Sequence, residues 1–484
     1  MIKLDFTFIN SGLEIGLHRL FPHMFKIFNH SIMVAFSVLT LAGCAAVGPD
    51  YAEPEAPISE NFEVTTDSGL HATPYEVIEW WEVFNDPVLN RLVEIAHKQN
   101  YSLELAGLRV LESRAQLGIA IGTQYPQQQI ASGGVTRISP SENAGQGNTA
   151  FSQYDLGASL AWEMDFWGKF RRGVESADAA LAASVANYDE AMVLVTAQVV
   201  SNYVSIRILE EQLSIARENL KLQQRSYDIA EVLYRNGQDS ELDVQQARTL
   251  LLGTQATVPE LKTQLELSRN ALNTLLGEPN GFVEKLITDG PIPDVPEQIA
   301  VGIPADLLRR RPDVRQAELQ AVAQNAQVGI ATADLYPSIA LTGSFGIASI
   351  SRDVGGGGSS DLFTSDSVNY TAGASFTWPV LNYGRIRNNI RVQDARLQQA
   401  VVSYQQVALE AAQEVDDAIV SLSGAQAQKA ILKQGVEAAR RSNDLSMLQY
   451  KEGFSGYQRV LDAQKSLFSQ QNRYASSQGL AVQS

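Results

Sequence analysis

The fold is decided by a stretch of sequence that occurs twice. Residues 155–169 read DLGASLAWEMDFWGK and residues 371–385 read TAGASFTWPVLNYGR, so the second copy lies 216 positions (371 minus 155) after the first. The match continues further along the chain, where Tyr234 corresponds to Tyr450 and Gly237 to Gly453. A repeat of this length indicates two copies of one structural unit, so we expect the protein to act with internal pseudo-symmetry.

A third match precedes the first two. Residues 115–126 read AQLGIAIGTQYP and residues 326–337 read AQVGIATADLYP, at a spacing of 211 positions (326 minus 115). The two spacings differ by five positions (216 minus 211), and this difference falls in the segment that holds Gly355–Gly358. The repeated unit therefore extends upstream of residue 155.

Polarity alternates residue by residue along both copies. Apolar residues alternate with small or charged ones from Asp155 to Phe166 and again from Tyr370 to Val380, and Ser338–Ile347 forms a third such segment. In a fourth segment, near 127–138, two adjacent glycines interrupt the alternation of polarity. Alternation over about ten residues with aromatic rings on the apolar side is typical of transmembrane β-strands. Half-buried hairpins of a soluble β-sandwich are the alternative.

Between the strand segments the apolar period becomes helical. An apolar stripe with a period of 3.5 residues runs from Leu181 to Leu220, and a second runs from Leu397 to Val436; this period predicts a left-handed coiled coil. Gly168 to Asn236 would form a helix on the order of 100 Å long at about 1.5 Å per residue. Tight turns at Asn236-Gly237 and at Glu452-Gly453 would reverse the chain. Helices of this length are suited to crossing a wide compartment such as the periplasm.

The amino terminus reads as an export signal. Ile32–Ala42 is apolar but too short to span a bilayer, and it ends in Leu41-Ala42-Gly43-Cys44, which resembles a bacterial lipobox. We expect Cys44 to carry diacylglycerol and palmitoyl groups as the first mature residue; a buried structural cysteine is the alternative. A leader of ordinary length would start at Met24, so residues 1–23 are predicted to be an extension that is not translated.

Composition argues against several classes of protein. The net charge of −17 is unlike the basic surface that nucleic-acid binding requires. The single cysteine excludes a disulfide framework and a thiolate metal cluster. The segment 453–457 lacks the second glycine of a nucleophile elbow, and Gly355–Gly358 lacks the lysine of a phosphate loop. We therefore expect no catalytic residue, no metal and no cofactor.

Four strands cannot close a barrel. Outer-membrane barrels of bacteria start at eight strands, and open strand edges in lipid would leave backbone groups without partners. The chain must therefore oligomerise, and two, three or four copies remain open on this argument.

Three motifs follow one another along the chain: Trp80-Trp81 with Phe84-Asn85-Asp86-Pro87, Ile303–Leu308 with Arg310–Val314, and Val460–Gln464. With these motifs in this order, the chain resembles the TolC-like outer-membrane efflux channels, in particular the NodT-type lipoprotein branch, over nearly all of its mature length. The resemblance implies a mainly α fold with a transmembrane β-barrel part. Each subunit of a homotrimer would give four strands to a shared twelve-stranded barrel, continuous with a periplasmic α-barrel of coiled-coil helical hairpins.

The resemblance also implies a domain division. Residues 1–43 would be the signal peptide, 44–275 the first efflux repeat, 276–303 an equatorial linker and 304–484 the second efflux repeat. The protein would lie in the outer membrane of a Gram-negative bacterium with its helices in the periplasm. Its partners would be outer-membrane lipid, a periplasmic adaptor protein and an inner-membrane transporter of the resistance–nodulation–division type.

The helix turns are the predicted site of gating. The selectivity-gate aspartate of the family matches Asp462 and a basic gate position matches Lys465, while a second family aspartate is replaced by Arg459. Asp462 and Lys465 share one helix face, and Asp243 is the nearest charge in the first repeat. Solvated surface charges are the alternative for all four. The resemblance further predicts that the adaptor docks on the turns Arg235–Ser240 and Lys451–Tyr457. The residues named within them are Arg235, Asn236, Gly237, Lys451, Gly453 and Ser455.

The expected function is passive conduction of small toxic molecules or drugs from the periplasm to the outside, as the exit duct of a tripartite efflux pump. A duct for protein or peptide secretion is the alternative, since it uses the same architecture. A third hypothesis is a lipid-anchored coiled-coil spacer without a pore, which the alternating strands argue against.

Overall fold

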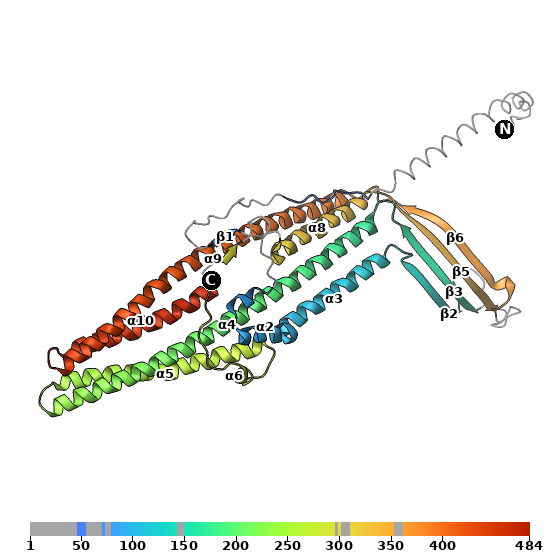
Figure 1. The fold of residues 1–484 in the computed structure, drawn as a ribbon. Coiled ribbons are helices and arrows are strands. Elements are labelled where there is room, and N and C mark those ends of the chain that lie inside the picture. Colours follow the sequence, from blue (N-terminus) through green and yellow to red (C-terminus); the bar gives the residue numbers. More distant parts are fainter. Residues whose placement is uncertain are drawn as a thin grey trace, which may run out of the picture. The chain divides into compact units, whose positions relative to one another are not determined.

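The computed structural model describes residues 46–54, 70–72, 79–141, 143, 150–295, 299–301, 310–352 and 362–484. The predictions for Cys44, for the start at Met24 and for Gly355–Gly358 lie outside these residues. The described chain is mainly helical with a few strands (Figure 1). It divides into two compact units, one formed by residues 1–52, 115–179 and 321–399 and the other by the remainder. Each unit is considered by itself.

The elements follow the order expected from the repeat. The helices are η1 (Trp80–Phe84), α2 (Pro87–Gln99), α3 (Tyr101–Gly122), α4 (Lys169–Arg235), α5 (Glu241–Leu275), α6 (Val283–Leu286), α8 (Pro312–Ala333), η4 (Ser365–Ser367), α9 (Arg385–Lys451) and α10 (Tyr457–Gln483). The strands are β1 (Leu70–Ala72), β2 (Gln128–Ile138), β3 (Phe151–Met164), β4 (Ile299–Val301), β5 (Ser338–Arg352) and β6 (Val368–Thr377).

The main sheet is antiparallel and has the strand order β2-β3-β5-β6 (Figure 1). Its register pairs Leu156 with Ile347 and Ile347 with Val368. Because paired residues of an antiparallel sheet point to the same face, one face carries the apolar side chains of three strands. The register therefore confirms the alternation predicted for β3, β5 and β6. Strands β1 and β4 form a separate parallel pair.

The two adjacent glycines of β2 have a packing reason. A Cβ atom at Gly133 would lie 3.1 Å from the side chain of Leu156, and one at Gly134 would lie 3.2 Å from the carboxylate of Asp155. The partner strand β3 thus fills the space that side chains on β2 would need. β2 pairs with β3 along its whole length although its alternation is weak in the sequence.

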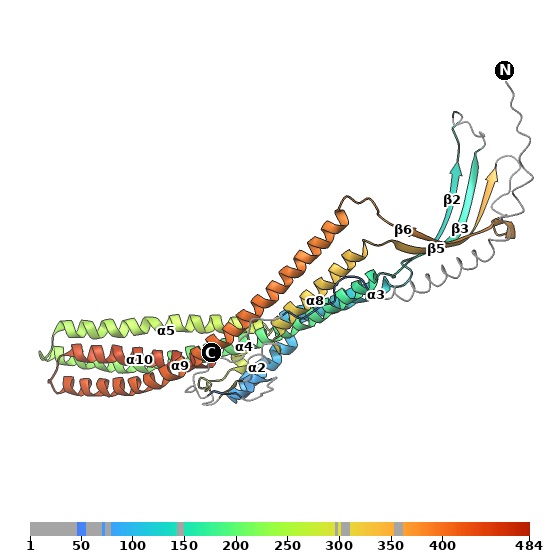
Figure 2. The same cartoon turned by 90° about the horizontal axis from the view of Figure 1, so that it is seen from above.

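Helices α4 and α9 each contain 67 residues, as the spacing of the turns predicts (Figure 2). Each follows a glycine with positive φ, Gly168 at 77° and Gly384 at 82°, a conformation that glycine adopts without steric cost. Of the predicted apolar stripes, only Val185 is exposed; the other members are buried or half-buried. The helical period therefore identified the packed face correctly.

Helix α4 is apolar enough in one 18-residue window to cross a membrane by length and composition, but 44% of that window is buried inside the protein. Its buried residues include Val199, Tyr203 and Ile206, which belong to one hydrophobic cluster with Leu89 and Leu92 of α2. The apolar character of α4 thus serves packing against neighbouring elements.

The motif 84–87 forms the start of α2. Asn85 has a φ of 50° and ends η1, and the Asp86 carboxylate accepts hydrogen bonds from the backbone N–H groups of Val88 (2.9 Å) and Leu89 (3.2 Å). The other Asp86 oxygen accepts a 2.5 Å bond from the Tyr203 hydroxyl. This N-cap therefore ties α2 to the middle of α4.

Of the second family motif, Ile303–Leu308 lies outside the described residues, and Arg310–Val314 leads into the start of α8. The Arg311 guanidinium pairs with Asp313 (2.9 Å) and with Glu414 of α9 (2.6 Å). Hydrogen bonding to Asp313, and then to Glu414, raises the pKa of Arg311, although its burial acts in the opposite direction. The contacts of Arg311 join α8 to α9.

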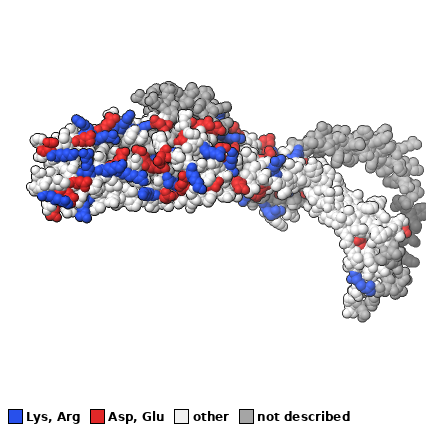
Figure 3. Space-filling view, turned by 60° about the horizontal axis from the view of Figure 1, so that its bottom comes forward, with Lys and Arg blue, Asp and Glu red and all other residues white. Residues whose placement is uncertain are grey.

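Charge is distributed unevenly over the surface. On the face shown in Figure 3, Lys, Arg, Asp and Glu are dense over the helices and sparse over the strands. Large apolar side chains are exposed on the strands instead, with Tyr370 77% exposed and Phe376 73% exposed. A sheet face of this kind is unsuited to water.

Candidate functional site

The turns after α4 and α9 have the same backbone geometry. Gly237 and Gly453 have φ values of 72° and 73°. After each glycine, the next N–H donates back to the last helical turn: Gln238 to the Leu233 carbonyl (2.9 Å) and Phe454 to the Gln449 carbonyl (2.8 Å). This is the Schellman arrangement, in which the residue with positive φ is usually glycine.

The helices that follow the turns begin differently. Ser240 caps α5: its hydroxyl accepts from the Asp243 N–H (3.2 Å) and donates to the Asp243 carboxylate (2.8 Å). Gly456 occupies the equivalent place before α10 and makes no side-chain bond. Asp243, predicted as a gate charge, thus lies in the first turn of α5, where an acidic side chain is favoured.

A side-chain contact joins the two turns. The Tyr450 hydroxyl, in the last turn of α9, donates a hydrogen bond to the carboxylate of Asp239 in the turn before α5. The Tyr450 ring meets the Tyr457 ring edge-on, with centroids 5.3 Å apart. Both rings belong to a buried cluster that also contains Ala230, Val244, Ala247, Val460 and Leu461. The tip of the four helices is therefore a packed contact between the hairpins (Figure 2).

Two carboxyl groups share the polar part of this contact. Burial, followed by hydrogen bonding to Asp239, raises the pKa of Asp243. Burial alone would also raise the pKa of Asp239, but hydrogen bonds with Asp243 and Tyr450 outweigh it and lower that pKa. Burial raises the pKa of Tyr457 to about 12 and that of Tyr450 as well. Asp239 is therefore the carboxyl that stays ionised, and Asp243 is the one that holds a proton more readily.

The other predicted gate residues lie on the exposed side of α10. Asp462 is exposed and accepts a 3.1 Å bond from the Gln458 side chain one turn earlier. Arg459 is also exposed. Lys465 lines a groove of about 710 Å³ between α5 and α10, together with Leu461 and Phe468. Within the described residues no ion pair joins Asp462 to Lys465, although they share a helix face as predicted.

The predicted docking residues surround the turns. Arg235 pairs with Glu231 at 2.7 Å and its side chain is 71% exposed. Asn236 and Lys451 are exposed. The Ser455 hydroxyl is buried without a hydrogen-bond partner among the described residues. The turns thus offer exposed polar groups together with one buried hydroxyl.

The sequence placed Asp239 and Tyr457 only within the turns predicted to dock an adaptor, and it did not predict that Tyr450 contacts them. Tyr450 was visible only as the repeat partner of Tyr234, and nothing near Asp239 marks it as the acceptor of a bond from a residue 211 positions away. The sequence feature that could have indicated this contact is the repeat of the glycine turn at Gly237 and Gly453. If the two turns lie at the same end of the helices, the residues beside them are expected to contact each other.

In the described part of the chain, no group of three or more His, Cys, Asp or Glu side chains is arranged so that it could hold a metal ion. His97 instead shares a 2.7 Å hydrogen bond with the Thr196 hydroxyl, and burial lowers its pKa.

An antiparallel sheet with an exposed apolar face and, separately, helical hairpins built on helices of 67 residues are features of outer-membrane channels with a helical extension. The family model described as "Outer membrane efflux protein" matches residues 92–278 and 303–484. The chain belongs to this family and is an outer-membrane efflux channel; these comparisons do not favour a secretion duct.

Individual relatives are similar to this chain over nearly its whole length. The chain is 32% identical over 440 residues to Nodulation protein T of Rhizobium leguminosarum bv. trifolii, covering 89% of this chain and 90% of that protein. It is 32% identical over 459 residues to the probable outer membrane lipoprotein SilC of Salmonella typhimurium, covering 93% and 94%. The solved structure of the outer-membrane channel OprN matches with a TM-score of 0.84 at 30% identity, covering 91% of this chain and 97% of that one. Among these, OprN is an outer-membrane channel and SilC is a probable outer membrane lipoprotein.

Proposed function

We propose that the chain is the exit duct of a tripartite efflux pump, built as a homotrimer and closed at the helical tip. The observation that carries the proposal is the four-stranded sheet, which has an apolar exposed face and is attached to helices of 67 residues. The two sequence repeats would form two pseudo-equivalent sectors of each subunit, with boundaries at 44–275 and 304–484. The family match over 92–278 and 303–484 supports this division.

The sheet face supports insertion into lipid. Leu156, Phe345 and Tyr370 lie on one face and are 50%, 62% and 77% exposed. Burying apolar surface is favourable at roughly 25 cal/mol per Å², so lipid is the solvent that such a face requires. Three copies give twelve strands, the number that the resemblance implies, and thereby provide partners for the sheet edges.

The residues after Cys44 support a lipid anchor at the base of the strands. The Val47 N–H donates to the Trp167 carbonyl at 3.0 Å, directly after β3. The buried Arg172 guanidinium pairs with Asp50 at 2.7 Å. An anchor on Cys44 would then enter the membrane next to the barrel, which fits the outer-membrane lipoprotein SilC.

The tip would close the duct. In the proposal, Asp462, Arg459 and Lys465 of three subunits form a charged constriction, and Asp243 contributes through the first turn. The Tyr450–Asp239 bond holds the two hairpins of one subunit together, so opening would require breaking or moving it. As a test, Asp462→Ala should raise the conductance of the purified channel; unchanged conductance would reject the gate role of that residue.

The proposed partners follow from the architecture. The turns at Arg235–Ser240 and Lys451–Tyr457 would dock a periplasmic adaptor, which links the duct to an inner-membrane transporter of the resistance–nodulation–division type. No cofactor, metal or catalytic step is part of the proposal. Neighbouring genes offer a check: a proton-driven pump with an adaptor supports efflux, and an ATP-driven exporter supports secretion.

Gene deletion tests the proposed function in cells. The strain without the gene should become hypersensitive to small toxic molecules in a panel of dyes, detergents, antibiotics and metal salts, and the wild-type gene should restore resistance. Unchanged susceptibility, in a strain that also lacks its other outer-membrane ducts, would contradict the proposal.

A further inference from the structure

The amino ends of α4 and α9 differ in charge although they are copies in the repeat. Residues 165–180 contain three basic and three acidic side chains, whereas the counterpart 381–396 contains four arginines and one aspartate. The whole chain carries a net charge of −17, so a basic segment stands out in it. All four arginines are exposed, and within the described residues none forms an ion pair; they are Arg385, Arg387, Arg391 and Arg396. A basic surface without its own counter-charges favours an anionic partner.

In the first copy the protein supplies the counter-charge itself. The Asp165 carboxylate accepts hydrogen bonds from the N–H groups of Phe170 (3.1 Å) and Arg171 (2.9 Å), and from the Arg171 guanidinium (3.3 Å). In the second copy, Leu381 takes the place of Asp165. The first turn of α9 has no acidic residue, and its two equivalent N–H groups have no acceptor among the described residues. The second copy therefore keeps the donors and lacks the anion.

A second change reverses a charge. Glu175 pairs with the Arg172 guanidinium at 2.7 Å, and Arg391 occupies the place of Glu175 in the second copy. Arg387 lies four residues before Arg391, so these two arginines share one helix face. We call them the basic stripe. Asp394, the single acid of the segment, lies about one turn farther from the sheet.

The segment that follows Cys44 indicates which way this face points. Asp50 of this segment pairs with the Arg172 guanidinium at 2.7 Å. Because the lipid on Cys44 would lie in the membrane, the segment runs along the outside of the barrel. Glu175 binds the same guanidinium and therefore lies on the outer side of α4. By the repeat, Arg391 lies on the outer side of α9.

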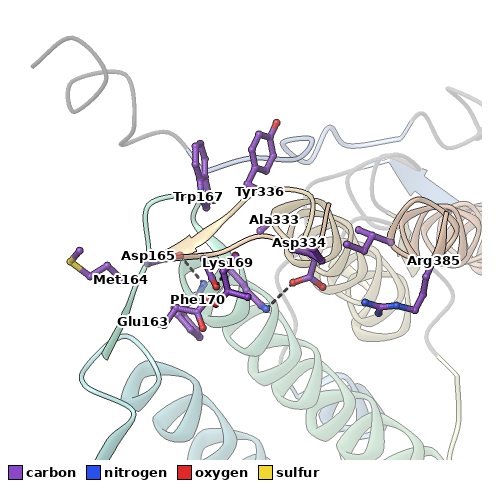
Figure 4. A pocket seen from close by; sticks show the side chains of 14 residues that line it. Glu163, Met164, Asp165, Trp167, Lys169, Phe170, Ala333, Asp334, Tyr336 and Arg385 are labelled. Carbon is purple, nitrogen blue, oxygen red and sulfur yellow. Dashed lines mark hydrogen bonds and ion pairs between the residues drawn. The ribbon is translucent and has the colours of Figure 1, made fainter. Parts of the chain in front are cut away.

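Aromatic side chains at the base of the strands place the stripe near the membrane surface. Trp167 stacks on Tyr336 with ring centroids 4.6 Å apart (Figure 4), while Trp378 and Tyr383 are 53% and 97% exposed. Aromatic rings of membrane barrels gather at the level of the lipid headgroups. Arg391 lies eight residues after Tyr383, which is about 12 Å along a helix axis. This distance is close to the Debye length of about 8–10 Å, so the charge acts on the headgroups.

We propose that Arg387 and Arg391, together with the N–H groups at the start of α9, bind the phosphate of an anionic lipid in the periplasmic leaflet of the outer membrane. The planar guanidinium presents a fork of donors that suits a phosphate group. The chain's own anchor segment would hold the first copy to the membrane, and a lipid headgroup would hold the second. The inference rests on the inserted sheet and the lipid anchor of the proposed function.

Native mass spectrometry of the purified full-length lipoprotein, titrated with phosphatidylglycerol, tests the proposal. The double variant Arg387→Gln with Arg391→Gln should bind this lipid about 25-fold more weakly, because each arginine near anionic lipid contributes about fivefold. The matched control is Arg440→Gln with Arg441→Gln, which removes two exposed arginines farther along α9 and should bind as the wild type does. Phosphatidylethanolamine with the same acyl chains, which has no net charge, should bind the wild type more weakly than phosphatidylglycerol.

A second variant restores the feature that the first copy has. Leu381→Asp returns a carboxylate to the place of Asp165, where it would occupy the N–H groups of α9 and weaken lipid binding. Leu381 is 83% exposed, so the substitution removes no core contact. Val402→Asp adds the same charge at another exposed position of α9 and should leave lipid binding unchanged.

Several results would overturn the proposal. Equal affinity of the wild type and the Arg387–Arg391 double variant would do so, as would equal binding of the two lipids. Inorganic phosphate that displaces nothing but binds as tightly as the lipid would assign the stripe to a free anion instead. Loss of the trimer in the double variant, with lipid affinity unchanged, would assign the stripe to a contact between subunits. A wild-type trimer that conducts but retains no phosphatidylglycerol would defeat this inference alone, whereas a wild-type protein without conductance would defeat the proposed function.

Discussion

The two turns at the tip share a backbone and differ in their side chains. The first turn carries Asp239 and the capping residue Ser240, whereas the second carries Phe454, which is 82% exposed, and the uncapped Gly456. The glycines at 237 and 453 keep nearly the same φ. Repetition thus preserves the geometry that reverses the chain, while the chemistry of each turn is free to diverge. The first turn supplies the carboxylate that holds the hairpins together, and the second supplies an exposed apolar ring.

Removing the bond between the turns should have the largest effect. Tyr450→Phe leaves the Asp239 carboxylate without its tyrosine donor, and a hydrogen bond to a charged group contributes about 1.5–3 kcal/mol. We expect a lower unfolding temperature and a higher conductance of the closed channel in planar bilayers. Tyr234→Phe, at the matching position of the first repeat, is the control and should change neither. Equal effects of the two variants would contradict the assigned contact.

Alanine substitution at either of the two turn glycines should lower the stability of the protein by a similar amount. A Cβ atom at Gly237 or Gly453 would meet nothing within 4 Å, so the cost of alanine is that of the positive φ alone. We expect each variant to lose about 1–2 kcal/mol of unfolding free energy in denaturant titration. Gly424→Ala inside α9 has equally open space and should instead stabilise the protein by about 0.5–1 kcal/mol. Unequal losses at 237 and 453 would show that the turns differ in backbone as well.

Substitutions at the two helix caps should change the stability of the protein in opposite directions. Ser240→Ala removes the cap of α5 and should cost about 1 kcal/mol. Gly456→Ser would add a cap to α10, where φ is −72° and a side chain has open space, and should stabilise by a few tenths of a kcal/mol. Thermal unfolding monitored by circular dichroism measures both. A destabilised Gly456→Ser variant would count against the comparison of the two turns.

The carboxyl pair should give the smallest effect, seen as a dependence on pH. The raised pKa of Asp243 contributes stability that is lost as pH rises through it, whereas the lowered pKa of Asp239 contributes stability that is lost as pH falls through it. Asp239 and Asp243 together therefore stabilise the protein most at a pH between their two pKa values, around the ordinary carboxyl pKa of 3.8. Asp243→Asn should flatten the fall in stability from mildly acidic to neutral pH. An unchanged pH profile would show that Asp239 and Asp243 do not interact.

Regular patterns could be predicted from the sequence, and contacts between distant residues could not. The alternation of β3, β5 and β6 and the stripe of α4 were predictable because they are set by local periods of two and 3.5 residues. The alternation of polarity along β2 was harder to recognise because Gly133 and Gly134 interrupt it. These two glycines leave space for the side chains of Leu156 and Asp155 on β3. The proposed gate residues Asp462 and Lys465 could be placed on one helix face from the sequence. The Tyr450–Asp239 contact depends instead on how two hairpins pack, which no local pattern encodes.

The central claim is that three copies of this chain enclose one conducting duct. The most direct measurement is the conductance of the purified full-length protein in planar bilayers, combined with its mass in the same detergent. The account predicts a trimer that gives small, discrete conductance steps, which become larger in Tyr450→Phe. A monomer, or a trimer without conductance in either the wild type or the variant, would contradict it.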